Sequence, residues 1–245
     1  MQKGAEWLAD SLTKAGLDNV VVDKTSGHPV VYADWLHAEG KPTMLIYGHY
    51  DVQPVAPLHL WDSEPFEPQV RDNKLYARGS SDDKGQVFMH VKAIEALLQT
   101  NKSLPVNVKF LIEGEEEVGS PNLEEYIENN KAKLSADVIV ISDTGMQGPG
   151  QPAVCYGLRG LCGVQIDVKG AKGDLHSGLY GGGVQNSIHA LVSILESFRD
   201  AEGTIEVEGF YDNVRPLADE EREAYVSLGF NEDDLKAEVG LDEFF

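Results

Sequence analysis

Three short clusters of acidic and metal-binding side chains stand out in this sequence of 245 residues. His49 and Asp51 lie in the string GHYDV, Asp82 and Asp83 lie in SSDDKG, and the glutamates 115–117 lie in EGEEEVGS. Imidazole nitrogens and carboxylate oxygens bind divalent metal ions, and a carboxylate also serves as a general base. Together the three clusters indicate a hydrolase.

The first cluster pairs a histidine with an acid. On a strand, side chains two positions apart project to the same side, so Asp51 can orient the His49 ring and raise its basicity. This arrangement is typical of a metal-binding histidine. Taken by itself, the pair fits an isolated loop histidine better, because such pairs are common. Five other histidines have no acidic cluster beside them and are interpreted as structural or surface residues: His28, His37, His59, His90 and His189.

The second cluster precedes a predicted helix and follows a glycine-serine turn. A carboxylate at a helix N-terminus accepts backbone N–H bonds and suits the helix dipole, so capping is the simpler explanation for one of the two aspartates. Two adjacent aspartates exceed what a cap requires. Because a carboxylate is able to bridge two cations, the bridging role is assigned to Asp82, with Asp83 beside it.

The third cluster is the glutamate run 115–117. Like charges packed together raise each other's pKa and destabilise a fold unless cations offset them. A solvated acidic turn is the alternative interpretation. With metal ions present, one glutamate would bind metal while its neighbour takes a proton from water and passes it to the leaving amine. Asp143, after another apolar run, adds an oxygen ligand.

Buried strands are predicted to deliver these side chains to one rim of a sheet. The predicted strands include the apolar runs 44–47 and 138–141 and the run 108–112, which is apolar except for Lys109. Amphipathic helices are predicted over 87–98 and 123–134, so strand and helix alternate along the chain. This alternation predicts an α/β fold, with a mostly parallel sheet flanked by helices. Ligands in such folds gather at the carboxyl ends of the strands.

The pattern changes in the later part of the chain. Short strands are predicted at 154–156 and 163–168, followed by a glycine-rich stretch and a helix through 188–195. We place a domain boundary here, which divides the chain into parts 1–160 and 161–245.

The composition argues against several classes of partner. Lys and Arg number 20 against 41 Asp and Glu, and the formal charge of -21 would repel nucleic acid and anionic lipid alike. No apolar stretch approaches the ~20 residues of a membrane span, and the N-terminus lacks a secretory apolar region, so a cytoplasmic protein is predicted. Cys155 and Cys162 are too few for a disulfide framework and are predicted to be buried free thiols.

Several blocks of the sequence carry a family resemblance. The strings LIYGHYDVQPV, LYARGSSDDKGQ, FLIEGEEEVGS, VIVISDT and DLHSGLYGG resemble the co-catalytic zinc peptidases, which include carnosinase-like dipeptidases, glutamate carboxypeptidases and acyl-amino-acid deacylases. The order and spacing agree from about residue 5 to the end of the chain. The VQP step and the Asp-Asp-Lys-Gly block are most similar to the dipeptidase branch.

The resemblance implies a role for each acidic cluster. By this resemblance, His49 and Asp143 hold one zinc ion, Asp82 bridges two ions, and Glu117 belongs to the second ion. Glu116 becomes the general base. Manganese and cobalt are the alternatives to zinc.

The resemblance also implies supporting roles outside the ligand set. Asp51 corresponds to the family's supporting catalytic aspartate. His176 corresponds to a substrate-binding histidine of a lid that, in dimeric relatives, reaches the partner subunit's site. Residues 1–160 would then be the N-terminal part of the catalytic domain, and 161–245 an incomplete α+β lid and dimerisation domain. The expected assembly is a homodimer through the lid.

The ligand set departs from the family at one point. Relatives supply a further histidine to the second zinc from beyond the lid, and no histidine follows His189 here. The chain is therefore expected to be a fragment whose second metal site lacks one ligand.

The expected function is metal-dependent hydrolysis of the peptide bond in dipeptides or short peptides, by water activated between two metal ions with a glutamate base. Two alternatives stay open, namely an N-acyl amino acid deacylase of the same fold and a non-catalytic metal-binding fragment.

Overall fold

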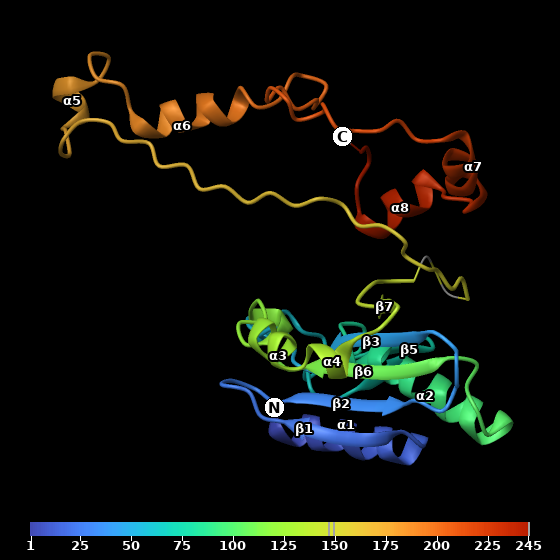
Figure 1. Cartoon of the computed structure of the whole chain (residues 1–245). Helices are drawn as coiled ribbons and strands as arrows, with labels where there is room; N and C mark the ends of the chain where they lie inside the picture. The colour runs from blue at the N-terminus through green and yellow to red at the C-terminus, as the bar shows by residue number, and fades with distance from the viewer. Residues whose placement is uncertain (147, 149, 245) are drawn as a thin grey trace. The chain divides into compact units, whose positions relative to one another are not determined.

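A computed structural model describes residues 1–146, 148 and 150–244. The chain forms two compact units, Met1–Arg159 and Gly160–Phe245 (Figure 1). The catalytic and lid roles assigned to the two parts of the chain stay predictions. Among the described residues, no helix combines the length and the hydrophobicity that crossing a bilayer requires.

The first unit is built on a five-stranded sheet of order β1-β2-β6-β3-β7. Its strands are β1 (Asp18–Asp23), β2 (Val30–Trp35), β3 (Thr43–His49), β6 (Asn107–Glu113) and β7 (Val138–Ile141). Strand β3 runs parallel to both β6 and β7. The three strands predicted from apolar runs are thus neighbours whose carboxyl ends meet at one edge.

The other two strand pairs are antiparallel, β1 with β2 and β2 with β6. The sheet is therefore mixed rather than mostly parallel, while the α/β class is confirmed. The connection between β1 and β2 spans only residues 24–29. A parallel pair needs a crossover of a dozen or more residues, so this short connection permits only an antiparallel pair.

Helices cover both faces of the sheet (Figure 1). α1 (Gln2–Ala15) and α2 (Lys84–Asn101) pack on one face, where their apolar residues join the larger core cluster. α3 (Leu123–Asn129) and α4 (Lys131–Leu134) contribute Tyr126 and Leu134 to the smaller cluster on the other face. Successive strand residues face opposite sides, so each strand supplies both clusters.

The helix predicted over 123–134 is interrupted at Asn130. The Asn130 side-chain amide donates to the Tyr126 carbonyl at 2.8 Å, which is the acceptor that its own backbone N–H would use in a continuous helix. Its backbone N–H bonds to Ile127 instead. Local side-chain competition of this kind ends α3 and restarts the chain as α4.

Short elements surround the sheet edge. The turn-rich segment after β3 contains a 3-10 turn, η1 (Leu58–Leu60), and a hairpin of β4 (Gln69–Arg71) and β5 (Lys74–Tyr76). A second 3-10 turn, η2 (Glu116–Val118), follows β6. η2 carries two of the three clustered glutamates.

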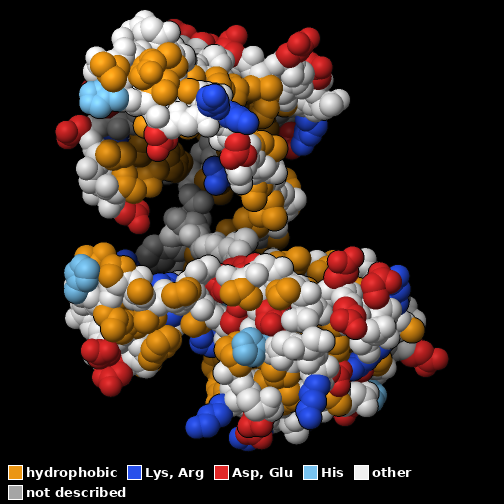
Figure 2. All heavy atoms as spheres, turned by 90° about the vertical axis from the view of Figure 1, so that its left-hand side faces the viewer, with side chains coloured by type: hydrophobic (Ala, Val, Ile, Leu, Met, Phe, Trp, Pro, Cys, Tyr) orange, Lys and Arg blue, Asp and Glu red, His pale blue; other side chains and the backbone are white. Residues whose placement is uncertain are grey.

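The second unit contains four helices in its described residues. They are α5 (Ser177–Tyr180), α6 (Ser187–Glu196), α7 (Asp219–Ser227) and α8 (Glu232–Val239). The helix predicted at 188–195 is confirmed as α6. Large hydrophobic side chains are exposed on α6, as elsewhere in this unit, and Figure 2 shows hydrophobic side chains in orange at the surface of the chain.

The prediction of strands at 154–156 and 163–168 is wrong. Residues 152–170 adopt no helix or strand. β-branched residues form a strand only where a neighbouring strand pairs with them, and no strand of the described residues pairs with this stretch. The two cysteines in this stretch, Cys155 and Cys162, are exposed free thiols rather than buried ones.

Gly48, next to His49 on β3, lies where α2 approaches the sheet closely. A Cβ atom at Gly48 would lie 2.5 Å from Asp83 Oδ2 and 2.6 Å from Val87 Cγ2. We expect Gly48→Ala to lower the free energy of unfolding by about 1–3 kcal/mol, because the core would be overpacked. Tryptophan fluorescence during chemical denaturation measures this, since all three tryptophans lie in the first unit.

The matched control is Gly145→Ala, because a Cβ atom at Gly145 would meet nothing within 4 Å. Its effect should stay within about 0.5 kcal/mol. Equal stability of the two variants would contradict the close packing at Gly48.

Candidate metal centre

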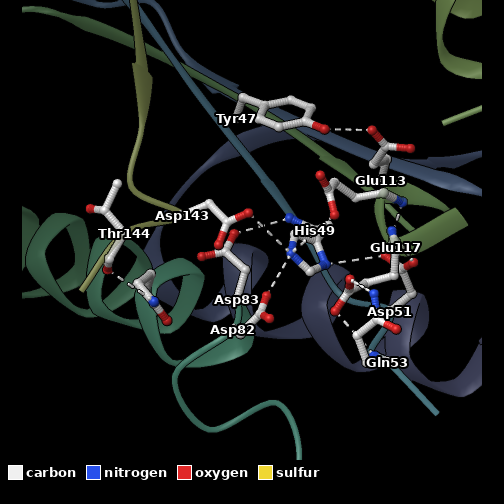
Figure 3. Close-up of polar contacts among 12 residues, drawn as sticks. Tyr47, His49, Asp51, Gln53, Asp82, Asp83, Glu113, Glu117, Asp143 and Thr144 are labelled. Atoms are coloured by element: carbon white, nitrogen blue, oxygen red, sulfur yellow. Dashed lines mark hydrogen bonds and ion pairs between the residues drawn. The ribbon is translucent and has the colours of Figure 1, made fainter. Parts of the chain in front are cut away.

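The candidate site lies at the carboxyl ends of the three parallel strands. His49 is the last residue of β3, Asp143 follows β7, and Glu116 and Glu117 lie in η2 after β6. Asp82 comes from the turn that leads into α2. Figure 3 shows His49 between the aspartates of the α2 turn and the η2 segment.

The His49 ring is fully buried and its Nε2 atom faces three carboxylates. Nε2 lies 3.2 Å from Asp82 Oδ1, 3.5 Å from Asp143 Oδ2 and 3.9 Å from Glu116 Oε2 (Figure 3). Two overlapping groups offer ligand atoms within 4.8 Å of one another: His49 with Asp82 and Glu117, and His49 with Glu116 and Asp143. The structure thus brings together every residue predicted to bind metal, with the predicted general base beside them.

The surroundings of His49 fit a divalent cation. Both of its ring nitrogens are buried without a well-aligned hydrogen bond. Among the described residues, no lysine or arginine forms an ion pair with the carboxylates that face Nε2, and Lys84 interacts with Asp82 and Asp51 only at longer range. An imidazole nitrogen and several carboxylate oxygens around one point are the donor set that zinc and similar ions take.

Negative charge dominates the surroundings of His49, and the pKa shifts of two groups agree with it. Burial by itself would lower the pKa of His49, but the carboxylates of Asp51, Asp83 and Asp143 outweigh it and raise that pKa. Burial raises the pKa of Glu116, and nearby carboxylates add to the rise. Each shift lessens the net negative charge, as a bound cation would.

Asp51 supports two parts of the site at once. Its Oδ1 lies 3.2 Å from His49 Nδ1, on the side of the ring away from the three carboxylates. Its two oxygens also accept the backbone N–H groups of Glu116 at 3.3 Å and Glu117 at 3.0 Å. Asp51 therefore holds the η2 turn by two hydrogen bonds and places a carboxylate beside the His49 ring.

Gln53 is a contact that sequence reasoning missed. Its backbone N–H donates to Glu117 Oε1 at 3.1 Å and its side-chain amide donates to Glu117 Oε2 at 2.5 Å. Residues 49, 51 and 53 are two positions apart, and Gln53 lies in the VQP step that the resemblance had singled out. The spacing of two residues was the signal in the sequence that could have predicted a contact of Gln53 with the site.

Asp83 does not cap α2 with its side chain. It occupies the N-cap position, but its Oδ2 accepts the backbone N–H of His49 at 3.1 Å. The capping explanation for this aspartate is therefore wrong, because its carboxylate holds the end of β3 instead.

The acids around the end of β6 divide according to their partners. Buried Glu113 accepts the Tyr47 hydroxyl at 2.5 Å and the Ser120 hydroxyl at 2.7 Å. Glu115 accepts the Asn122 amide at 2.8 Å. Glu116 and Glu117 face the His49 side of η2. Glu115, which had no role in the sequence analysis, is thus a structural residue.

His176 lies in the second unit. Its Nδ1 accepts the Gly178 backbone N–H at 3.0 Å and so caps the short helix α5. Its side chain is exposed, and its substrate-binding role stays a prediction.

A family profile described as Peptidase family M20/M25/M40 matches residues 45–229. The chain belongs to this family. It is 39% identical over 218 residues to the Cys-Gly metallodipeptidase dug1 of Schizosaccharomyces pombe, which covers 87% of this chain and 46% of that protein. It is 38% identical over 218 residues to the Beta-Ala-His dipeptidase of Homo sapiens, which covers 88% of this chain and 43% of that protein.

Among solved structures, this chain is similar to the M20 family metallo-carboxypeptidase Sso-CP2 from Sulfolobus solfataricus. The TM-score is 0.78 at 39% identity, and the match covers 100% of this chain and 55% of that one. The present chain thus spans about half the length of the relatives that it matches.

The buried carboxyl of Asp83 predicts a pH dependence of stability. Burial raises its pKa from 3.8 to about 6 in the folded chain. Between these values the folded state keeps a proton that the unfolded chain has released, so the free energy of unfolding falls as pH rises. Asp83→Asn removes this group, and its amide oxygen still accepts the His49 N–H.

In EDTA, the stability of Asp83→Asn relative to the wild type should therefore rise from pH 4 to pH 7, by about 1–3 kcal/mol. Chemical denaturation at several pH values measures the difference. A difference that does not change with pH would contradict the raised pKa.

Proposed function

We propose that this chain carries the metal centre of a peptidase that hydrolyses the peptide bond of dipeptides. The observation that carries the proposal is the buried His49 Nε2 atom facing the carboxylates of Asp82, Asp143 and Glu116. The relatives named as Cys-Gly and Beta-Ala-His dipeptidases support the substrate class.

The proposed ligands are divided between two zinc ions. His49 and Asp143 would hold one ion, Glu117 would belong to the other, and Asp82 would be shared by both. The two groups of candidate ligand atoms around His49 support a metal site here, while the division between two ions follows the family resemblance. Bound divalent ions would supply Lewis acidity at the scissile carbonyl and lower the pKa of water. Manganese or cobalt fits the same oxygen-rich set.

Glu116 is proposed as the general base. It takes a proton from the attacking water and passes it to the nitrogen of the leaving amine. Its raised pKa brings its proton affinity closer to neutral pH, which favours both transfers. Asp51, which accepts the Glu116 N–H, keeps this carboxylate near the reacting groups.

The second unit is proposed to be part of a lid and dimerisation domain, with His176 contacting substrate across a homodimer. The family membership supports this assignment. A cytoplasmic location is proposed on the composition of the chain.

A carboxypeptidase acting on longer peptides is the second candidate. The metallo-carboxypeptidase Sso-CP2 matches the whole chain and favours it. The two activities differ in the length of peptide that the site accepts.

The glutamate roles predict different outcomes for neighbouring substitutions. Glu116→Gln should keep its metal and lose activity by about 10²–10⁴-fold, because the proton acceptor is removed. Glu117→Gln should lose metal, because a carboxylate ligand is removed. Elemental analysis after dialysis and an assay on Cys-Gly and β-Ala-His measure the two effects.

Glu115→Gln is the matched control, because Glu115 contacts Asn122 rather than the site. It should keep both metal and activity. Loss of metal from Glu116→Gln would make Glu116 a ligand and break the assignment.

The substrate class is tested on peptides of increasing length. A dipeptidase should hydrolyse dipeptides and lose activity when a third residue is added to either end. Efficient release of single C-terminal residues from tetrapeptides would contradict the dipeptidase proposal and favour the carboxypeptidase.

A further inference from the structure

Asp143 lies on a segment with little support from its own strand. β7 pairs with β3, and the side chains of Val138, Ile139 and Ile141 are 55%, 61% and 56% exposed. The register with β3 ends at Ile141, two residues before Asp143. Something other than the sheet must therefore fix the Asp143 carboxylate opposite His49.

Two side chains of α2 contact the residues on either side of Asp143. His90 Nε2 lies 2.8 Å from the Ser142 hydroxyl. The Gln86 side-chain amide donates to the Thr144 carbonyl at 3.3 Å, a contact drawn beside Thr144 in Figure 3. The segment 142–144 is thus held before and after its aspartate.

Gln86 also contacts the segment that carries the other candidate ligand. Its amide nitrogen donates to the Ser81 carbonyl at 2.6 Å, directly before Asp82. Both of its partners are carbonyl oxygens, which fixes which end of the amide carries the nitrogen. One side chain therefore links the chain segments of Asp82 and Asp143.

The helix that carries these two residues is itself fixed to the sheet. Gln86 and His90 are four residues apart and share one face of α2. Val87, Val91 and Ile94 are buried in the larger core cluster. Because α2 is packed on the sheet, its Gln86 and His90 side chains are held at a fixed distance from β3 and His49.

We propose that His90 and Gln86 are positioning residues, which hold the Asp143 carboxylate at His49 and set its spacing from Asp82. The inference rests on the proposed metal centre and deepens it. His90, interpreted from the sequence as structural or surface, would act through Ser142 and Asp143 without touching metal or substrate.

A hydroxyl both donates and accepts, so the His90 contact with Ser142 forms with either tautomer of the ring. Groups that orient metal ligands change metal affinity by about 10–100-fold when removed. We expect the lower end of that range, because His90 contacts the neighbour of the ligand rather than the ligand itself.

The test is a double-mutant cycle on zinc affinity, measured by calorimetric titration of ZnCl₂ into the full 245-residue chain. His90→Phe should weaken zinc binding about tenfold in the wild-type background. In an Asp143→Asn background the same substitution should change affinity less than about twofold, because its effect passes through Asp143. His90→Gln, which restores a donor at similar reach, should recover most of the affinity.

If His90→Phe folds poorly, Gln86→Leu serves as a second variant. It should also weaken zinc binding about tenfold in the wild-type background and less than about twofold in the Asp143→Asn background. Its matched control is Gln99→Leu, because Gln99 lies on the same helix and its amide contacts Glu95 at 3.4 Å, away from the site. The control should bind zinc as the wild type does. Denaturation in EDTA compares the folding of all variants.

Three outcomes would overturn the inference. Unchanged affinity in both His90→Phe and Gln86→Leu would show that Asp143 is held without them. A full tenfold loss that persists in the Asp143→Asn background would show that His90 acts elsewhere. A wild-type chain that binds no zinc would overturn the proposed metal centre as well, which separates that failure from the other two.

Discussion

Negative charge concentrated at the carboxyl ends of β3, β6 and β7 constrains the rest of the first unit. Asp82, Asp143 and Glu116 face one buried imidazole nitrogen, and no lysine or arginine among the described residues forms an ion pair with them. The side chains of Asp82, Glu116 and Asp143 are 51%, 37% and 32% exposed, so water screens part of their mutual repulsion and a bound cation would compensate the rest. The arrangement is explicable if the fold is built to hold cations at this edge.

The hydrogen bonds around the site separate structural acids from chemical ones. Glu113 is satisfied by two hydroxyl groups and Glu115 by an amide. Asp51 and Asp83 accept backbone N–H groups that fix η2 and the end of β3. Asp82, Asp143 and Glu116 face His49, while Glu117 accepts two hydrogen bonds from Gln53. Hydrogen bonds thus set Glu113 and Glu115 apart from the site, and they orient Glu117 rather than leave it free.

Much of this arrangement could be predicted from the sequence because it follows from short-range pattern. Apolar runs located β3, β6 and β7, and the parallel α/β arrangement placed their polar ends at one edge. The side-chain period of two put Asp51 beside His49. Family membership is confirmed by the match over residues 45–229.

The remainder depended on tertiary contacts that spacing does not encode. The partner of His90 lies 52 residues away, so nothing near His90 indicated its contact with Ser142. Asp83 looked like a helix cap because its acceptor role toward His49 spans 34 residues. The prediction of strands at 154–156 and 163–168 was wrong because a strand also depends on a tertiary contact: no strand of the described residues pairs with this stretch.

The central claim is that His49 and the surrounding carboxylates bind a divalent metal ion. Anomalous diffraction at the zinc edge from crystals of the zinc-loaded chain tests it most directly. The account predicts a zinc peak about 2.0–2.2 Å from His49 Nε2, with an oxygen of Asp143 or Asp82 at similar distance. Zinc bound only at other residues, with His49 Nε2 left without a metal, would contradict it.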